Sequence, residues 1–359
     1  MNQWDKMLLK TRFFQFSFFL ILSSFFSCSV DSPQKSVSLF KLSGESQGTT
    51  YLIQVYDENL NFEARQIDSI LRAFDHELST YEPSSLITRF NQKDFKDTIL
   101  PYDSRFYQML DLSDYIYTLS NGFFDPSIKP LIDLWGFDND HTNIPDKQVI
   151  DSVLQFVSFE RGVHYDFSQF TDTSFRIVKH NPMFQLDFNA IAQGYAVDLL
   201  LDFINTKGHQ NVYVELGGEI AVSGVKFNKE KWRIGVETPI SNNKTSDKVI
   251  QKVFSLTGKR IATSGNYRKY FVVDNKKYSH TINPKTGYQN RHNLLSATVF
   301  SNSCARSDAF ATFFMLIGVE ASKSFIQAHP ELELDIFLIF DESNQFKTYL
   351  SEGLLSSEG

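Results

Sequence analysis

Residues 189–224 read NAIAQGYAVDLLLDFINTKGHQNVYVELGGEIAVSG, and this stretch decides the fold class. Its first half is typical of a helix that closes at Gly208. Its second half alternates on both sides of Gly217-Gly218, the pattern of two strands joined by a glycine turn. Because similar helix and hairpin patterns recur along the chain, the sequence predicts an α+β domain with mixed, mainly antiparallel sheets and packed helices.

The neighbouring segments extend this pattern in both directions. Helices are predicted over residues 62–80, over 104–120 with a left-handed stop at Asn121-Gly122, and over 307–330. Strands are predicted over residues 49–56, 185–188, 231–239, 259–265, 267–274 and 293–301. Residues 241–248 (SNNKTSDK) have the composition of an exposed loop without an assigned role.

The N-terminus has the pattern of an export signal. Basic residues precede the apolar run 13–26, which is too short for a comfortable membrane span and ends at Ser27-Cys28. We therefore expect residues 1–28 to be a lipoprotein signal peptide ending at a lipidated Cys28, residues 29–38 a flexible spacer, and residues 39–355 the folded body. The protein would be exported and lipid-anchored to a bacterial membrane on the periplasmic side, with inner or outer membrane left open. A plain signal peptide or a disordered tail is the alternative.

Charge and motif content exclude several function classes. The net charge of −7, without a stripe of Lys and Arg, argues against a nucleic-acid partner. Neither a phosphate loop of the GxxxxGK[ST] type nor GxGxxG, HExxH or paired CxxC motifs occur, so the common nucleotide and zinc sites are unsupported. With Cys28 lipidated, Cys304 would have no partner, so disulfides would not hold the fold together.

Asp308 and Thr312 form the first candidate site. They are four residues apart at the start of a predicted helix, so they share one face and offer a carboxylate and a hydroxyl to one cation. Hard oxygen ligands of this kind suit Mg²⁺. The alternative is that Asp308 is an acid placed in the first helical turn by the helix dipole.

Residues 186–198 (LDFNAIAQGYAVD) form the second candidate site. Asp187 ends the predicted strand, and a helix begins near Ile191 after small residues. Helix N-terminal N–H groups favour phosphate, so this turn is a plausible pyrophosphate site. Packing alone is the other reading, with Gln193 an ordinary polar residue of the first turn.

His280 is the third candidate, immediately before the turn 283–287 (NPKTG). A histidine there could position or deprotonate a hydroxyl nucleophile near neutral pH. A structural histidine is the alternative.

Taken together and in order, many short blocks resemble the ApbE family of FAD:protein FMN transferases. The match covers nearly all of the body. The blocks are QGTTY (47–51), STY (79–81), RFN (89–91), GFFDP (122–126), PLIDLWGF (130–137), LDF (186–188), AQGYAVD (192–198), ELGGEI (215–220), ATSGNY (262–267), SH (279–280), NPKTG (283–287) and SDA with Thr312 (307–312).

The resemblance implies a single ApbE-like (T-fold-like) domain with FAD in a central cleft and Mg²⁺ on its pyrophosphate. By motif position, the metal ligands would be Asp308, Thr312 and the backbone carbonyl of Ala190, and the catalytic residues His280 and Asp308. The FAD contacts would be Gln47, Tyr81, Phe123, Phe124, Asp125, Asp187, Gln193 and Ile282. Many relatives have Met at position 47, a charged residue at 193 and Asp at 283, where this chain has Gln, Gln and Asn.

The implied reaction moves FMN from FAD to a protein hydroxyl. An acceptor Ser or Thr hydroxyl attacks the FMN phosphorus in line and AMP leaves, with Mg²⁺ neutralising charge on the pyrophosphate. By resemblance, the partner is a flavoprotein subunit of a redox or ion-pumping complex. Two alternatives stay open: an FAD pyrophosphatase that gives FMN and AMP, and a flavin-binding lipoprotein without chemistry.

Overall fold

The computed structural model describes residues 36–136, 144–239, 249–266, 270–273, 276–279 and 281–357. Within these ranges the main sheet has eight strands, and every neighbouring pair is antiparallel. Across the sheet the strands are β1 (Ser38–Ser46), β2 (Thr49–Asp57), β6 (Val212–Leu216), β7 (Glu219–Ser223), β10 (Arg260–Gly265), β13 (Leu294–Ser301), β14 (Asp335–Glu342) and β15 (Gln345–Leu350).

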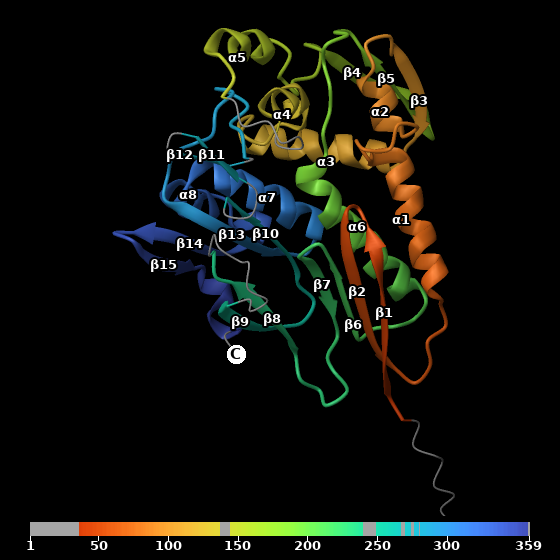
Figure 1. Cartoon of the computed structure of the whole chain (residues 1–359). Helices are drawn as coiled ribbons and strands as arrows, with labels where there is room; N and C mark the ends of the chain where they lie inside the picture. The colour runs from red at the N-terminus through yellow and green to blue at the C-terminus, as the bar shows by residue number, and fades with distance from the viewer. Residues whose placement is uncertain are drawn as a thin grey trace, which may run out of the picture. The chain divides into compact units, whose positions relative to one another are not determined.

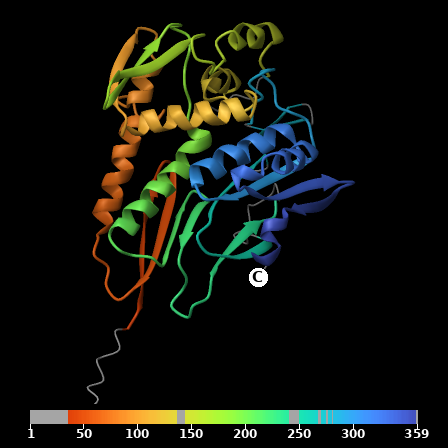
Figure 2. The same ribbon diagram turned by 180° about the vertical axis from the view of Figure 1, so that it is seen from behind.

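Two helices, α6 (Asn189–Thr206) and α7 (Cys304–Ile317), pack side by side on one face of this sheet (Figure 2). Alternation along the strands explains the two faces. Val299 of β13 lies in the core with α7, whereas its neighbour Phe300 lies in a different core with the hairpin of β8 (Trp232–Glu237) and β9 (Ile250–Leu256). The sheet is therefore covered by helices on one face and by a hairpin on the other.

A second group of elements surrounds α3 (Arg105–Leu119) (Figure 1). It includes a small antiparallel sheet whose strands follow the order β3 (Asp97–Pro101), β5 (Ser174–Lys179) and β4 (Tyr165–Thr171). Its helices are α1 (Ala64–Leu78), α2 (Leu86–Asn91), α4 (Lys129–Trp135) and α5 (Lys147–Leu154). Phe90, Phe106 and Phe184 pack together in its core and bury large apolar surfaces.

The remaining elements are short. They are α8 (Val319–Ala328), the pair β11 (Tyr270–Val273) and β12 (Lys276–Ser279), and the 3-10 helices η1 (Pro126–Ile128), η2 (Pro330–Leu332) and η3 (Glu352–Ser357).

The structure confirms the predicted α+β class and most predicted elements. The glycine turn after β6 has positive φ at both Gly217 and Gly218, and α3 stops before the left-handed pair Asn121-Gly122.

Two predicted elements were wrong. Residues 307–330 form two helices rather than one, because Gly318 adopts φ 80 between α7 and α8. Residues 185–188 have no strand partner, because the amide of Asn91 both donates to the carbonyl of Leu186 and accepts from its N–H. This side chain replaces the bonds that a neighbouring strand would make.

Residues 1–35 and 241–248 lie outside the described residues, so the signal peptide, Cys28, most of the spacer and the exposed loop stay predictions. Val37–Gly359 forms one compact unit, and β1 begins at Ser38, close to the predicted start of the body. No helix in the described part of the chain combines the length and apolarity that crossing a bilayer requires.

Candidate functional site

At the crossing of α6 and α7, Asp308 contacts the backbone of α6 one turn after Ala190. At the crossing, Gly194 lets the helix backbones approach closely, since a Cβ there would lie 2.4 Å from the carbonyl oxygen of Cys304. The N–H of Gly194 donates to Oδ2 of Asp308 at 3.1 Å. In a regular helix that N–H also faces the carbonyl of Ala190, so Gly194 links two of the predicted oxygen ligands.

Asp308 does not lie in the first helical turn, where the alternative interpretation of the sequence placed it. The helix begins at Cys304, where the Ser303 side chain accepts from the N–H of Arg306, so Asp308 lies in the second turn and not the first. The helix dipole acts within the first turn and does not account for a buried carboxylate here. Thr312 follows one turn later on the same helix.

The electrostatics around Asp308 are unusual. Burial raises the pKa of its carboxyl well above the ordinary value, and the nearby charge of Glu219 raises it further, while the Gly194 N–H opposes the shift. Glu219 begins β7, is itself buried, and was given no role by sequence reasoning. The signal in the sequence was an acidic residue directly after the Gly-Gly turn, at the start of a predicted strand.

Ser264 is a second residue that sequence reasoning missed. It lies on β10, and its Oγ is 3.1 Å from Oγ1 of Thr312. It belongs to the block 262–267, which contributed to the resemblance without a role for this side chain.

The relative placement of the two helices depends on Asp198 of α6. Its carboxylate accepts from the backbone N–H groups of Cys304 and Ala305 and from the hydroxyl of Ser303, and it is bonded to Arg260 at 2.6 Å. Asp198 therefore caps α7 and ties it to α6.

The predicted pyrophosphate turn leads into α6. Both carboxylate oxygens of Asp187 accept from Asn189, one from its backbone N–H at 2.7 Å and one from its side-chain amide at 3.1 Å. Asp187 is buried and Ala190 is the second residue of the helix. The turn thus orders the first helical residues, where Ala190 offers its carbonyl.

Gln193 of α6 and Gln47 of the β1–β2 turn come from neighbouring elements. A Cβ on Gly217 would lie 2.7 Å from Nε2 of Gln193 and 3.0 Å from the methyl group of Thr49, so the β1–β2 turn, the β6–β7 turn and α6 meet there. Gln47 holds φ 53 in the β1–β2 turn. Its Nε2 is buried and has no hydrogen-bond partner among the described residues, so it is a donor available to a ligand.

Three predicted contacts follow the turn at the end of α3, namely Phe123, Phe124 and Asp125, and their surroundings differ. Phe123 packs against Phe313 of α7, with Nζ of Lys285 4.4 Å from its ring centre. Phe124 lies in the main core instead.

Asp125 is also buried, and its carboxylate accepts from the N–H and hydroxyl of Ser127 and from the N–H of Phe159. Burial raises its pKa to about 6, although these donors oppose the shift.

The other predicted contacts are spread out. Tyr81 is 68% exposed between α1 and α2, and Ile282 is buried with Leu131 and Trp135 of α4. His280 lies outside the described residues, so its role stays a prediction. The turn after it is formed as predicted, because Asn283 Oδ1 accepts from the N–H of Lys285 at 2.9 Å.

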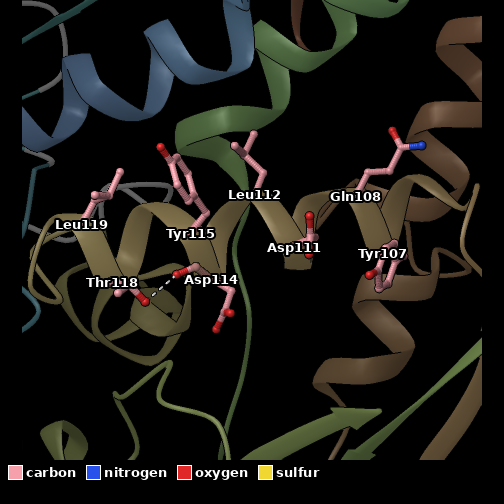
Figure 3. Close-up of a pocket in the computed structure, with 8 residues that line it drawn as sticks. All are labelled: Tyr107, Gln108, Asp111, Leu112, Asp114, Tyr115, Thr118 and Leu119. Atoms are coloured by element: carbon pink, nitrogen blue, oxygen red, sulfur yellow. Dashed lines mark hydrogen bonds between the residues drawn. The ribbon is translucent and has the colours of Figure 1, made fainter. Parts of the chain in front are cut away.

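Two surface hollows are lined by other residues. The first, of about 630 Å³, runs along α3 (Figure 3). Its lining residues are Tyr107, Gln108, Asp111, Leu112, Asp114, Tyr115, Thr118 and Leu119. The second, of about 720 Å³, borders the start of α3 and includes Arg89 and Arg105. Neither includes a predicted site residue, so the central FAD cleft stays a prediction.

The predicted cation site is not a cluster of acids. Among the described residues, no three His, Cys, Asp or Glu side chains come together to hold a metal ion. The candidate donors are instead one carboxylate, one hydroxyl and one backbone carbonyl, which are the oxygen ligands that Mg²⁺ accepts while keeping waters and phosphates.

Comparisons with known proteins identify the family of this chain. The FAD:protein FMN transferase of Haemophilus influenzae is 28% identical over 337 residues, which cover 91% of this chain and 94% of the relative. That of Vibrio cholerae is 29% identical over 322 residues, covering 89% and 92%. The solved structure of the flavin transferase ApbE from Vibrio cholerae matches with a TM-score of 0.75 at 27% identity, covering 90% of this chain and 100% of that chain.

The match is continuous through the elements that carry the candidate site. The family model described as the ApbE family matches residues 47–336, which include both turns around Gln193 and the two crossing helices. The family and the α+β fold expected from the sequence are therefore confirmed. This chain belongs to the ApbE family.

Proposed function

We propose that this chain is an Mg²⁺-dependent FAD:protein FMN transferase, which moves FMN from FAD to a Ser or Thr hydroxyl of an acceptor protein and releases AMP. The comparisons support the flavin transferase activity, since the curated relatives with this name match over most of both chains. The observation that carries the proposal for this chain is the α6–α7 crossing, where Gly194 joins Asp308 to the turn of Ala190.

The donor set at this crossing fits a magnesium ion. Asp308 would supply a charged oxygen, and Thr312 and the Ala190 carbonyl neutral ones. Bound there, Mg²⁺ supplies positive charge against the diphosphate of FAD and its transition state. The buried carboxylate of Asp308 beside Glu219 favours a cationic occupant, because burial otherwise opposes its negative charge.

The residues of the chain itself bind and orient the dinucleotide. In the first turn of α6, the N–H of Asn189 donates to Asp187, and those of Ile191 and Ala192 donate to the carbonyl of Phe188. The support for a phosphate at this turn is therefore the positive end of the helix dipole. Nε2 of Gln47 is a buried donor for a ligand acceptor, and Gln193 lies beside the neighbouring glycine turn. The acceptor hydroxyl would attack the FMN phosphorus from the side opposite to AMP, with His280 near the phosphates.

The activity is tested by incubating the full chain with FAD, Mg²⁺ and a candidate acceptor. A covalently fluorescent acceptor band, a mass increase of one FMN on one hydroxyl, and release of AMP are expected. Accumulation of AMP and free FMN without acceptor labelling would assign a pyrophosphatase instead. Stoichiometric FAD binding without AMP release at any Mg²⁺ concentration would assign a binding protein.

The proposed acceptor is an exported flavoprotein subunit of a redox or ion-pumping complex. This follows from the family and from the export signal predicted for residues 1–28. Mass spectrometry of a co-expressed candidate subunit tests it, because transfer adds FMN at one Ser or Thr. Replacing the labelled Ser or Thr of the acceptor should abolish the FMN adduct. The rate at which the enzyme consumes FAD in the absence of acceptor should stay the same.

We also propose that a lipid on Cys28 anchors the protein to a membrane, on the periplasmic side. The support is the basic and apolar segment that ends at this cysteine. Cys28→Ser should move the protein from the membrane fraction to the soluble fraction, measured by fractionation and immunoblotting. Cys304→Ser is the matched control, because Cys304 is buried in the fold. Membrane retention of the Cys28→Ser protein would refute the anchor.

A further inference from the structure

Ser264 is the described side chain that contacts the hydroxyl of Thr312. Their oxygen atoms are 3.1 Å apart, although the residues are separated by 48 positions in the chain. Ser264 lies near the end of β10, which is held between β7 and β13 in the main sheet. Its backbone is in register with Ala297 of β13. The serine is therefore presented to α7 from the part of β10 that is paired with β13, since the pairing with β7 covers only Arg260 and Ile261.

A neutral hydroxyl that binds a cation has a fixed requirement for its proton. The oxygen offers a lone pair to the cation, so its O–H must donate in another direction. For Thr312, Oγ of Ser264 lies 3.1 Å away and can accept that proton, and either hydroxyl could be the donor. With a cation on the oxygen of Thr312, Thr312 is the donor, and its lone pair serves the side of the helix shared with Asp308.

Threonine on a helix needs such a partner to hold its orientation. Its hydroxyl populates two χ1 rotamers, because it also bonds to the carbonyl three or four residues earlier. For Thr312 the carbonyl four residues earlier belongs to Asp308. A rotation toward that carbonyl would take the hydroxyl away from Ser264, so the contact with Ser264 selects between the two orientations.

We propose that Ser264 is a positioning residue of the cation site: it accepts the hydrogen bond of Thr312 and orients that hydroxyl toward a cation held by Asp308. The inference deepens the proposed function and rests on its assignment of Thr312 as a ligand. It adds a residue from the sheet to a ligand set that otherwise comes from α6 and α7. Serine at 264 does not touch the cation itself.

Thr263 provides a matched control within the same strand. Its hydroxyl is 2.9 Å from that of Thr298, so it also makes a hydroxyl-to-hydroxyl contact between β10 and a neighbouring element. Successive side chains of a strand point to opposite faces, so Thr263 points away from Thr312. Thr263→Val removes one such contact from the sheet without touching the proposed site.

The experiment measures Mg²⁺ binding to the full-length protein by calorimetric titration, with Mn²⁺ paramagnetic resonance as a second probe. Ser264→Ala should raise the dissociation constant about tenfold, the typical loss when a residue that orients a metal ligand is removed. Ser264→Thr keeps the hydroxyl and should restore binding. Thr263→Val should bind as the wild type does.

Kinetics separate positioning from general damage. Ser264→Ala should raise the Mg²⁺ concentration that gives half-maximal FMN transfer, while kcat at saturating Mg²⁺ stays close to the wild-type value. Equal loss of binding in Ser264→Ala and Thr263→Val would overturn the inference, because a weakened sheet would then explain both. Unchanged Mg²⁺ binding in Ser264→Ala would also overturn it.

A Thr312→Val variant distinguishes failure of this inference from failure of the proposed function. If Thr312→Val weakens Mg²⁺ binding and Ser264→Ala does not, Ser264 has no positioning role but the ligand assignment stands. If Thr312→Val binds Mg²⁺ as tightly as the wild type, the ligand assignment is wrong and the inference falls with it. FMN transfer that needs no divalent cation would instead refute the Mg²⁺-dependent function.

Discussion

The two halves of the candidate site are built differently. The proposed cation half consists of Ala190, Asp308 and Thr312, on two helices that cross directly. The predicted flavin half consists of Gln47, Tyr81, Phe123, Phe124, Asp125, Asp187, Gln193 and Ile282. In the cation half, side-chain and backbone partners orient the ligand groups. In the flavin half, Tyr81 is exposed, whereas Phe123, Phe124 and Ile282 belong to three different cores.

The difference shows which part of the site is ready before any ligand binds. Ser303 and Asp198 cap α7, and the N–H of Gly194 on α6 holds the Asp308 carboxylate, so the proposed cation half is preorganised. The flavin half is carried by turns and by residues whose rings are committed to packing, such as Phe124. We therefore expect substitutions in the cation half to alter chemistry and those in the flavin half to alter binding or folding. The following predictions test this division, from the largest effect to the smallest.

Asp308→Ala should have the largest effect, because it removes the charged ligand of the cation half. FMN transfer should fall by more than about 100-fold, since loss of even an indirect partner of a metal ligand costs 10–100-fold. The melting temperature should not fall, because burial and the charge of Glu219 both disfavour the ionised carboxyl in the folded state.

The measurements are acceptor labelling, AMP release and a thermal melt. Asp202→Asn is the control, since Asp202 is an exposed acid of α6. Near-normal transfer by Asp308→Ala at saturating Mg²⁺ would remove Asp308 from the mechanism.

Asp198→Asn should be the most destabilising change among these predictions. It disrupts the ion pair with Arg260 and the cap of α7, and breaking a buried pair costs about 3–5 kcal/mol. Urea unfolding measures the loss. Asp202→Asn shares the same arginine but is 62% exposed, so it should cost about 1 kcal/mol or less. Equal losses in both variants would show that Asp198 does not hold the helices together.

Gly194→Ala should force α6 and α7 apart. The new Cβ would meet the backbone carbonyl of Cys304 at 2.4 Å, and overpacking of this kind costs about 3 kcal/mol or less. Gly235→Ala on β8 is the control, because its Cβ would meet only the flexible end of Ile250 at 3.1 Å. Chemical denaturation should show a larger loss of stability in Gly194→Ala than in Gly235→Ala, and Mg²⁺ binding should weaken only in Gly194→Ala. A Gly194→Ala protein as stable as Gly235→Ala would contradict the close crossing.

The pH dependence of the free energy of unfolding tests the surroundings of Asp125 in the flavin half. Burial raises its folded-state pKa to about 6, above its ordinary value, so the folded state keeps the proton that the unfolded state releases. The stability contributed by this proton is full below the unfolded pKa and is lost as pH rises through about 6. Two pKa units correspond to about 3 kcal/mol at most, and we expect about 2 kcal/mol between pH 4 and 7.

The comparison is between wild type and Asp125→Asn, which has no titrating group at this position. The free energy of unfolding, measured from pH 4 to 7, should fall less in the variant than in the wild type. Ser127→Ala is a second probe, because it removes a donor to the same carboxylate and should enlarge the pH dependence. Parallel pH curves for wild type and Asp125→Asn would contradict a raised pKa.

Local patterns of the sequence were sufficient for the elements that carry the site. The helix over 189–206, the glycine turn after β6 and the stop of α3 follow from spacing and from residues that accept positive φ. The absence of a strand at 185–188 could not be foreseen in this way, because the backbone of Leu186 bonds to the side chain of Asn91, 95 residues earlier.

By itself, the sequence determined the α+β class, the family and the pairing of Asp308 with Thr312 on one helix, because these depend on short spacings and ordered motifs. Tertiary structure alone decided which groups surround that pair. Gly194 lies 114 positions from Asp308, and Ser264 lies 48 from Thr312. Such contacts arise from how helices pack on a sheet, and packing depends on the whole core and not on local periodicity.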